Sequence, residues 1–279
     1  MGDNFVGPDQ LRALQAGDRP VRLIDVRWRL PQPDGRADHR AGHLPGAVYV
    51  PLDTELSDPH AEGAGRHPLP STEALQAAVR RWGVNRGDLV VAYDDADGLA
   101  AARAWWLLRQ AGIDVRVLDG GLRAWTGAGH PLETGDVAPE PGDAVLEPIG
   151  ADVLTIDEAA AFPASGVLLD VRAPERYRGE IEPYDPVAGH IPGAVNLPTG
   201  RHLDGDGRVR DAAAIRAELA GVGVVEGTEV AAYCGSGITA AHTALVLAEA
   251  GIPARIFPGS WSQWSHTPGR PVATGALPG

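Results

Sequence analysis

The chain has 279 residues, enough for one large domain or two of ordinary size, and 44% of them are hydrophobic. The net charge of −13 argues against nucleic acid or an acidic membrane as a partner. One cysteine excludes an internal disulfide, and the lack of a run of about 18 apolar residues argues against a membrane span. The first residues lack the pattern of a signal peptide, so a cytoplasmic location is expected.

The first half of the chain alternates predicted strands and helices. Strands are expected at residues 21–25, 47–50, 89–93 and 115–118. Ser71 is expected to cap a helix that runs through Trp82. Further helices are expected at residues 99–111, before Gly112, and near residues 122–125.

The second half repeats this alternation after a Pro- and Gly-rich stretch. Strands are expected at residues 168–171, 194–197, 229–233 and 254–257, and helices at residues 211–219 and 239–250. This order predicts an α/β fold in which a mainly parallel sheet carries helices on both faces. Ligands of such folds bind at the carboxyl ends of the strands.

The two halves are copies of one unit. Leu-Ile-Asp-Val-Arg at residues 23–27 returns as Leu-Leu-Asp-Val-Arg at residues 168–172. Ala-Gly-His-Leu-Pro-Gly-Ala-Val at residues 41–48 returns with one change at residues 188–195. The order of the matches indicates a duplicated domain. We therefore expect domains at residues 1–135 and 152–279, joined by a linker over residues 136–151 that packs on the surface.

The stretch Tyr-Cys-Gly-Ser-Gly-Ile-Thr-Ala at residues 233–240 joins a predicted strand to a predicted helix. A short Gly-rich turn there directs several backbone N–H groups and the positive end of the helix dipole toward one point. The anion that the turn itself carries is a Cys234 thiolate. A lone cysteine is most often a small buried hydrophobe, but the glycines around Ser236 favour a nucleophile.

These motifs resemble the tandem-domain rhodaneses over residues 5–265. The Cys-Gly-Ser-Gly-Ile-Thr loop is similar to that of the 3-mercaptopyruvate sulfurtransferases, whereas thiosulfate enzymes commonly place Arg or Lys after the cysteine. The resemblance implies a catalytic second domain and an inactive first domain. Asp94 stands at the position in the first copy that matches Cys234, and a carboxylate is no sulfur nucleophile. We expect neither a cofactor nor a metal ion.

The resemblance also implies roles for individual residues. Cys234 matches the persulfide-forming cysteine, Ser236 and Asp53 match residues that assist it, and His67 matches a nearby histidine. Arg176 matches the arginine that binds the donor's anionic end. The backbone around the cysteine is expected to bind substrate through Gly235, Gly237, Ile238 and Thr239. From the residues alone, Arg176 also fits a solvated charge, and Asp53 and His67 also fit ordinary loop residues.

The donor is the open question. Mercaptopyruvate enzymes often carry a second arginine nine residues after the first, but here that position is Asp185, as in many thiosulfate enzymes. We expect 3-mercaptopyruvate as donor and a thiol, such as thioredoxin or a low-molecular-weight thiol, or cyanide as acceptor. The alternative is a thiosulfate:cyanide sulfurtransferase in which Arg178 or Arg66 completes the anion site.

Two other classes of protein fit the sequence less well. A cysteine phosphatase needs Cys-x5-Arg, but Ala240 stands where that arginine would be. A non-catalytic rhodanese module for binding or regulation usually lacks the cysteine.

Because Asp53 and His67 precede the linker, we expect the active site in the cleft between the domains. Residues present in both copies are expected to serve the shared fold; these are Asp25, Asp170, His43 and His190.

Overall fold

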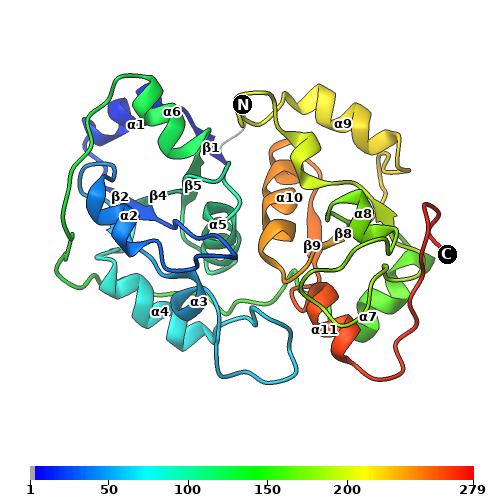
Figure 1. The fold of residues 1–279 in the computed structure, drawn as a ribbon. Helices are drawn as coiled ribbons and strands as arrows, with labels where there is room; N and C mark the ends of the chain where they lie inside the picture. The colour runs from blue at the N-terminus through cyan, green and yellow to red at the C-terminus, as the bar shows by residue number, and fades with distance from the viewer. Residues whose placement is uncertain (1–3) are drawn as a thin grey trace. The chain divides into compact units, whose positions relative to one another are not determined.

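The computed structural model describes residues 4–279 and contains two compact units (Figure 1). The first comprises the described chain up to Pro59, Leu69–Ala151 and Gly205–Val209, and the second comprises His60–Pro68, Asp152–Asp204 and Arg210–Gly279. Residues 1–3, part of the segment that argues against a signal peptide, lie outside the described residues. No helix within residues 4–279 is long and apolar enough to cross a membrane.

The first unit is built on a five-stranded parallel sheet in the order β1-β5-β4-β2-β3. Its strands are β1 (Phe5–Val6), β2 (Val21–Asp25), β3 (Val48–Tyr49), β4 (Leu89–Tyr93) and β5 (Val115–Leu118). Its helices are α1 (Pro8–Gln15), α2 (Arg36–Ala41), α3 (Leu52–Glu55), α4 (Thr72–Arg81), α5 (Ala101–Gln110) and α6 (Gly121–Gly127).

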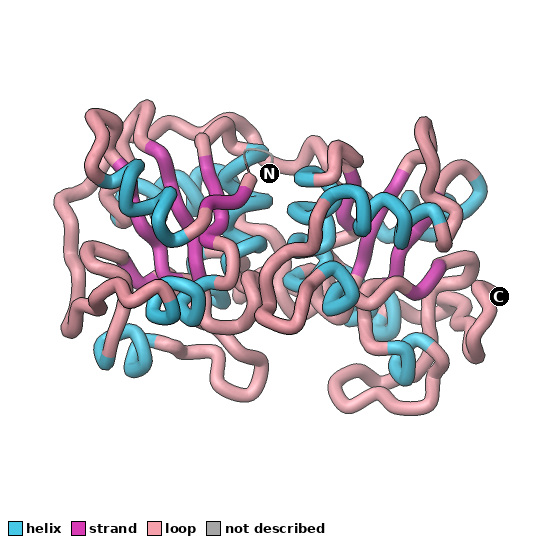
Figure 2. The backbone as a smooth tube through the Cα atoms, turned by 90° about the horizontal axis from the view of Figure 1, so that it is seen from above, coloured by secondary structure: helices cyan, strands magenta, loops and turns pink. Residues whose placement is uncertain are grey.

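The second unit repeats this plan with a four-stranded parallel sheet in the order β7-β6-β8-β9. Its strands are β6 (Val167–Asp170), β7 (Val195–Asn196), β8 (Val230–Tyr233) and β9 (Ala254–Ile256). Its helical segments are α7 (Ile156–Ala161), η1 (Phe162–Ala164), α8 (Pro174–Tyr177), η2 (Thr199–His202), α9 (Ala212–Ala220), α10 (Ile238–Glu249) and α11 (Ser260–His266). Figure 2 shows the strands of each unit between two sets of helices.

The predicted parallel α/β architecture is confirmed, and the strands and helices that were predicted lie within two residues of their expected bounds. Ser71 caps α4 by accepting a hydrogen bond from the Ala74 N–H, and Asp211 caps α9 in the same way through the Ala214 N–H. The helices α1, α2 and α7, of eight, six and six residues, were not predicted, nor were shorter elements such as β1 and α3. Residues 128–151, which follow α6, contain no named helix or strand. The Ala144 N–H in this segment donates to the Val84 carbonyl of the first unit.

A buried carboxylate ends the central strand β6 of the second unit. Asp170 is fully buried and accepts hydrogen bonds from Arg172 Nη2 and the Tyr233 hydroxyl, both at 2.6 Å. Arg172 also donates to the Gly189 carbonyl, while the Tyr233 hydroxyl accepts the Ile191 N–H. Burial alone would lower the pKa of Arg172, but the attraction and the hydrogen bonds of Asp170 outweigh it and raise that pKa. The group therefore ties the ends of β6 and β8 to the Gly-His-Ile-Pro segment.

The first unit contains the same arrangement around Asp25. Its carboxylate accepts hydrogen bonds from Arg27, His39 and the Tyr93 hydroxyl. Burial alone would raise the pKa of Asp25, but the hydrogen bonds from His39 and Arg27 outweigh it and lower that pKa. His43 is also fully buried, with Nδ1 2.8 Å from the His39 carbonyl oxygen. These contacts support a structural role for the residues that both copies share.

His242 in α10 makes the stability of the protein depend on pH. The imidazole is fully buried, with Nδ1 2.9 Å from the Thr199 hydroxyl oxygen. Burial, assisted by repulsion from His202, lowers the pKa of His242 to about 3. The unfolded chain binds a proton near pH 6.5 that the folded chain does not, so falling pH favours unfolding.

We expect His242 to remove up to about 1.4 kcal/mol from the free energy of unfolding for each pH unit between about 6.5 and 3. Urea unfolding at a series of pH values measures this slope, and His242→Gln should make it shallower by about one proton. An unchanged slope in the variant would show that His242 is not the group that titrates.

Candidate active site

Cys234 lies where β8 ends and α10 begins. The side chain is buried at 3% exposure, and the Gly237 N–H donates to Sγ at 3.1 Å. Gly237 has φ +82° and is the N-cap of α10, whose twelve residues direct the positive end of their dipole toward the loop. An anion on Cys234 is therefore stabilised by a hydrogen bond and by the helix end. Ile238 and Thr239 form the first turn of this helix.

Helix α11 holds the loop from the other side. Cys234 donates its N–H to the Ser260 hydroxyl at 3.1 Å, and its carbonyl accepts the Trp261 N–H at 3.0 Å. The Gly235 carbonyl accepts the Ser262 N–H at 2.9 Å. A Cβ on Gly237 would lie 2.5 Å from the Pro258 carbonyl oxygen, so only glycine fits there. The position of the thiol is thus fixed by backbone contacts on both sides.

His67 and Ser236 lie together beside the cysteine. His67 Nδ1 is 2.8 Å from the Ser236 hydroxyl oxygen, and both side chains are buried. His67 belongs to the segment 60–68, the light blue loop between α3 and α4 in Figure 1, which groups with the second unit. Its expected place in the first unit is therefore wrong, because tertiary contacts of this segment override its position in the sequence.

Arg176 extends from α8 toward the cysteine loop. Its Nη1 lies 3.2 Å from the position that a Cβ on Gly235 would occupy. Its Nε and Nη2 donate to Glu182, with Nη2 2.7 Å from Oε1. The guanidinium carbon also lies 5.3 Å from the centre of the Tyr184 ring. Arg176 is therefore held in place by a carboxylate and is only 14% exposed, unlike a freely solvated surface arginine.

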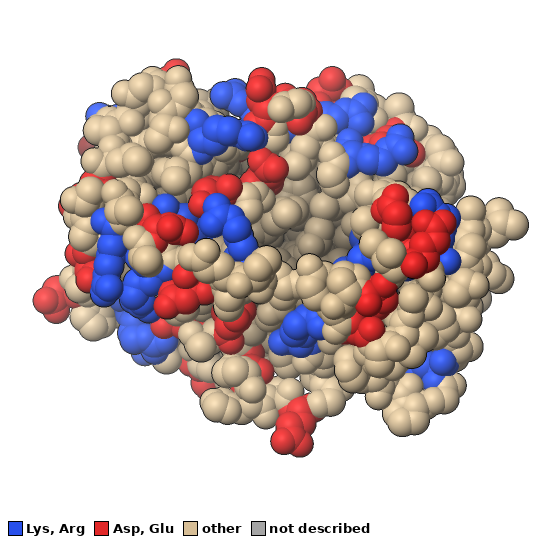
Figure 3. All heavy atoms as spheres, viewed as in Figure 1, with Lys and Arg blue, Asp and Glu red and all other residues tan. Residues whose placement is uncertain are grey.

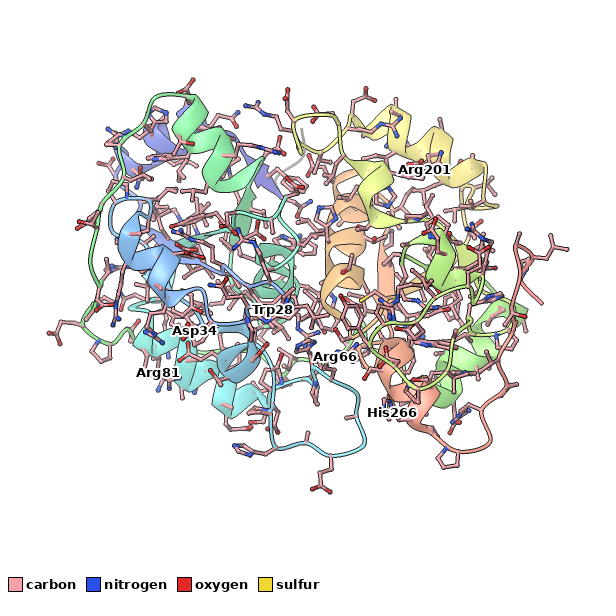
Figure 4. The ribbon with its side chains drawn as sticks, viewed as in Figure 1. Trp28, Asp34, Arg66, Arg81, Arg201 and His266 are labelled. Atoms are coloured by element: carbon pink, nitrogen blue, oxygen red, sulfur yellow. The ribbon has the colours of Figure 1, made fainter. Side chains whose placement is uncertain are left out.

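Asp53 belongs to α3 of the first unit. One of its carboxylate oxygens accepts a hydrogen bond at 2.7 Å from the indole of Trp28, which Figure 4 labels. This contact supports a local structural role for Asp53. Its expected assistance to Cys234 stays a prediction.

Asp94 occupies the loop of the first unit that matches the cysteine loop. Its carboxylate is fully buried and accepts four backbone N–H groups at 2.8–2.9 Å, from Ala96, Gly98, Ala100 and Ala101. Burial raises the pKa of Asp94, and these backbone hydrogen bonds oppose that shift. A strand-to-helix turn of this chain thus encloses a carboxyl group with its N–H groups, in the way expected for the thiol of the cysteine loop.

Glu182 was not predicted as a site residue, because no motif distinguishes it from other acidic residues. Its hydrogen bonds with Arg176 form only when the chain around Glu182 is folded. Within residues 4–279 no group of three or more His, Cys, Asp or Glu is placed to hold a metal ion. Figure 3 shows acidic and basic side chains interspersed over the face in view.

Comparison with known proteins is consistent with this geometry. The family model for the rhodanese-like domain matches residues 7–128 and 155–267. A putative thiosulfate sulfurtransferase, SseB of Mycobacterium tuberculosis strain H37Rv, is 50% identical over 266 residues, which cover 94% of this chain and 93% of the relative. A probable 3-mercaptopyruvate sulfurtransferase of Pseudomonas aeruginosa is 41% identical and covers 95% of this chain and 96% of its own length.

Solved structures of sulfurtransferases also match this chain. SseA from Escherichia coli, described as a 3-mercaptopyruvate sulfotransferase, matches with a TM-score of 0.81 and 32% identity. That match covers 94% of this chain and 100% of the other. The 3-mercaptopyruvate sulfurtransferase from Leishmania major matches with a TM-score of 0.84 and 29% identity, covering 94% of this chain and 74% of that one.

The close approach of Gly237 to Pro258 gives a stability prediction. Gly237→Ala should lower the free energy of unfolding by at least about 1 kcal/mol more than Gly227→Ala does. Both glycines have positive φ, +82° and +84°, and so share a backbone cost of about 1–2 kcal/mol, but a Cβ on Gly227 meets nothing within 4 Å. Urea denaturation of both variants measures the difference, and equal losses would refute the steric argument.

Proposed function

Because this chain belongs to the rhodanese family and is a sulfurtransferase, we propose that it moves sulfur from 3-mercaptopyruvate to a thiol or cyanide through a persulfide on Cys234. The observation that carries the proposal is the Cys234 sulfur, which accepts the Gly237 N–H at the start of α10. The same contact favours a thiolate before the transfer and a persulfide anion after it.

The first step forms one S–S bond and breaks one C–S bond. The Cys234 thiolate attacks the thiol sulfur of 3-mercaptopyruvate, and the electron pair of the C–S bond passes to carbon as the enolate of pyruvate. The thiol proton ends on that carbon, so the products are pyruvate and a Cys234 persulfide anion. Arg176 binds the donor's carboxylate and orients the sulfur toward Cys234.

Ser236 and His67 handle the proton of this step. The Ser236 hydroxyl lies two residues from the cysteine and 2.8 Å from His67 Nδ1, so a proton can pass between them. Thiosulfate brings no thiol proton, and its reaction does not need this relay. The pair therefore favours a donor that carries a thiol.

The second step returns the enzyme to its starting state. Cyanide or an acceptor thiolate attacks the outer sulfur of the persulfide, and the electron pair of the S–S bond returns to Cys234 as thiolate. Cyanide leaves as thiocyanate. A thiol, such as thioredoxin or a low-molecular-weight thiol, leaves as its own persulfide. Neither step needs an external oxidant or reductant, because every electron pair stays with the donor, Cys234 or the acceptor.

Thiosulfate is the second candidate donor. Its outer sulfur would pass to Cys234 while sulfite leaves with the bonding electron pair. The observation that favours it is a second guanidinium, that of Arg66, near Gly235, because a dianion binds two cations better than one. A non-catalytic rhodanese module would form no persulfide with either donor.

Cys234→Ser should lower thiocyanate formation to below about a thousandth of wild type, because the serine oxygen cannot carry the sulfur. Intact mass measurement after donor treatment should show one added sulfur on the wild type and none on the variant. The variant should unfold at the same urea concentration as the wild type. Persulfide on the wild type also excludes the non-catalytic alternative, and turnover by the variant would place the nucleophile elsewhere.

Ser236→Ala should lower kcat/KM for 3-mercaptopyruvate by about a hundredfold and that for thiosulfate by much less, because only the first donor has a thiol proton to move. His67→Phe keeps a ring but removes the nitrogen and should show the same dependence on the donor. Steady-state kinetics with both donors measures it. Equal losses for the two donors would mean that the pair only supports the loop.

A further inference from the structure

Arg66 lies next to the cysteine loop although it is far from it in sequence (labelled in Figure 4). Its Nη2 is 3.8 Å from the position of a Cβ on Gly235, on which Arg176 Nη1 also converges at 3.2 Å. Two guanidinium groups therefore face the space in front of Gly235. A side chain at residue 235 would fill that space.

The neighbours of Arg66 hold it there. A Cβ on Gly65 would lie 2.6 Å from the Gly259 carbonyl oxygen, so the chain passes directly over the start of α11. On the other side His67 binds Ser236. The Gln263 amide donates to the Gly63 carbonyl at 3.1 Å. Arg66 is thus positioned by contacts before and after it, as expected of a site built for binding.

Asp185 fixes the guanidinium of Arg66. The carboxylate accepts from Arg66 Nη1 at 3.0 Å and from Nη2 at 3.3 Å, and it lies 3.5 Å from Arg176 Nη2. The side chains of Asp185 and Glu182 are 0% and 3% exposed, whereas those of Arg66 and Arg176 are 27% and 14% exposed. The carboxylates are therefore buried and the guanidinium groups are the accessible part of the cluster.

Arg176 and Arg66 each have one nitrogen that donates to neither of the two buried carboxylates. None of the hydrogen bonds of Arg176 within the described residues uses Nη1, the atom that lies nearest the Gly235 position. Arg66 Nε is buried and has no hydrogen-bond partner within the same part of the chain. The Arg66 atom nearest the Gly235 position is Nη2, whose hydrogen bond to Asp185 is the longer of the two at 3.3 Å.

The geometry points to Arg66 as the second residue, beside Arg176, that binds the anionic end of the sulfur donor. Mercaptopyruvate enzymes often carry an arginine at the position of Asp185, and Arg66 takes the role of that arginine here. This inference rests on the proposed function. The bound group is a compact oxyanion, either a carboxylate or the sulfonate-like end of thiosulfate, that accepts from Arg176 and Arg66 together. Arg178, the other candidate, instead donates to Glu180 at 2.7 Å and 2.8 Å.

Arg66→Gln should lower kcat/KM for both donors about tenfold or more, mainly by raising KM, because a charge-assisted hydrogen bond is lost. The loss should be larger for thiosulfate, which carries two charges. Arg178→Gln removes the same charge from the same unit and should stay within about twofold of wild type. A change within twofold for Arg66→Gln, or a larger loss for Arg178→Gln, would overturn the assignment.

A purely structural role for Arg66 is tested by the double variant Arg66→Gln/Asp185→Asn. If Arg66 only neutralises Asp185, removing both charges restores wild-type KM, and the inference is wrong. If Arg66 binds the donor, KM stays raised. Binding of thiosulfate to Cys234→Ser, measured by calorimetry with and without Arg66→Gln, separates the two proposals. Weaker binding with Arg66→Gln supports Arg66 even if the wild type transfers no sulfur, and unchanged binding overturns its role alone.

Discussion

The buried carboxylate at the end of one central strand in each unit is the interaction on which the rest of this structure depends. Asp170 joins Arg172 and Tyr233, and Tyr233 is the residue directly before Cys234. Removing one partner of such a buried pair commonly costs about 3–5 kcal/mol, because the other charge is left without compensation. The hydrogen bonds to Asp170 therefore fix the strand end from which the cysteine loop starts. The same group around Asp25 has no nucleophile to position, which separates its structural role from catalysis.

The matching turns after β4 and β8 differ in the group that their backbone N–H groups bind. In the first unit, Asp94 supplies its own carboxylate to the backbone N–H groups, so the turn is satisfied within the fold. In the second, Cys234 receives the Gly237 N–H, and Gly235 leaves open the space that two guanidinium groups face. The N–H groups of the first turn are thus bound by a side chain of that turn, whereas the second turn carries the thiol of Cys234.

The sequence allowed the strands, the main helices and the cysteine loop to be predicted, because their signals are local. Buried strands such as β4 and β8 are apolar runs, Ser71 is a typical cap, and the glycines around Ser236 mark a tight turn. The partners of the loop depend instead on how distant segments pack. The segment that carries His67 precedes α4 in sequence but packs in the second unit, and no periodicity indicates such a choice. Glu182 likewise acquires its role only through its contact with Arg176.

The charges around Arg66 and Arg176 show why counting charged residues near a motif is a poor guide to specificity. An acidic residue at position 185 suggests a weaker anion site when the sequence is read alone. In the structure, the carboxylate of Asp185 is buried and orients Arg66, whose guanidinium is the more exposed member of the pair. A buried carboxylate that aligns a guanidinium lowers the entropy that the arginine loses when it binds an anion. The charge of Asp185 therefore acts through the orientation of Arg66, and the sign at one position does not decide what the site binds.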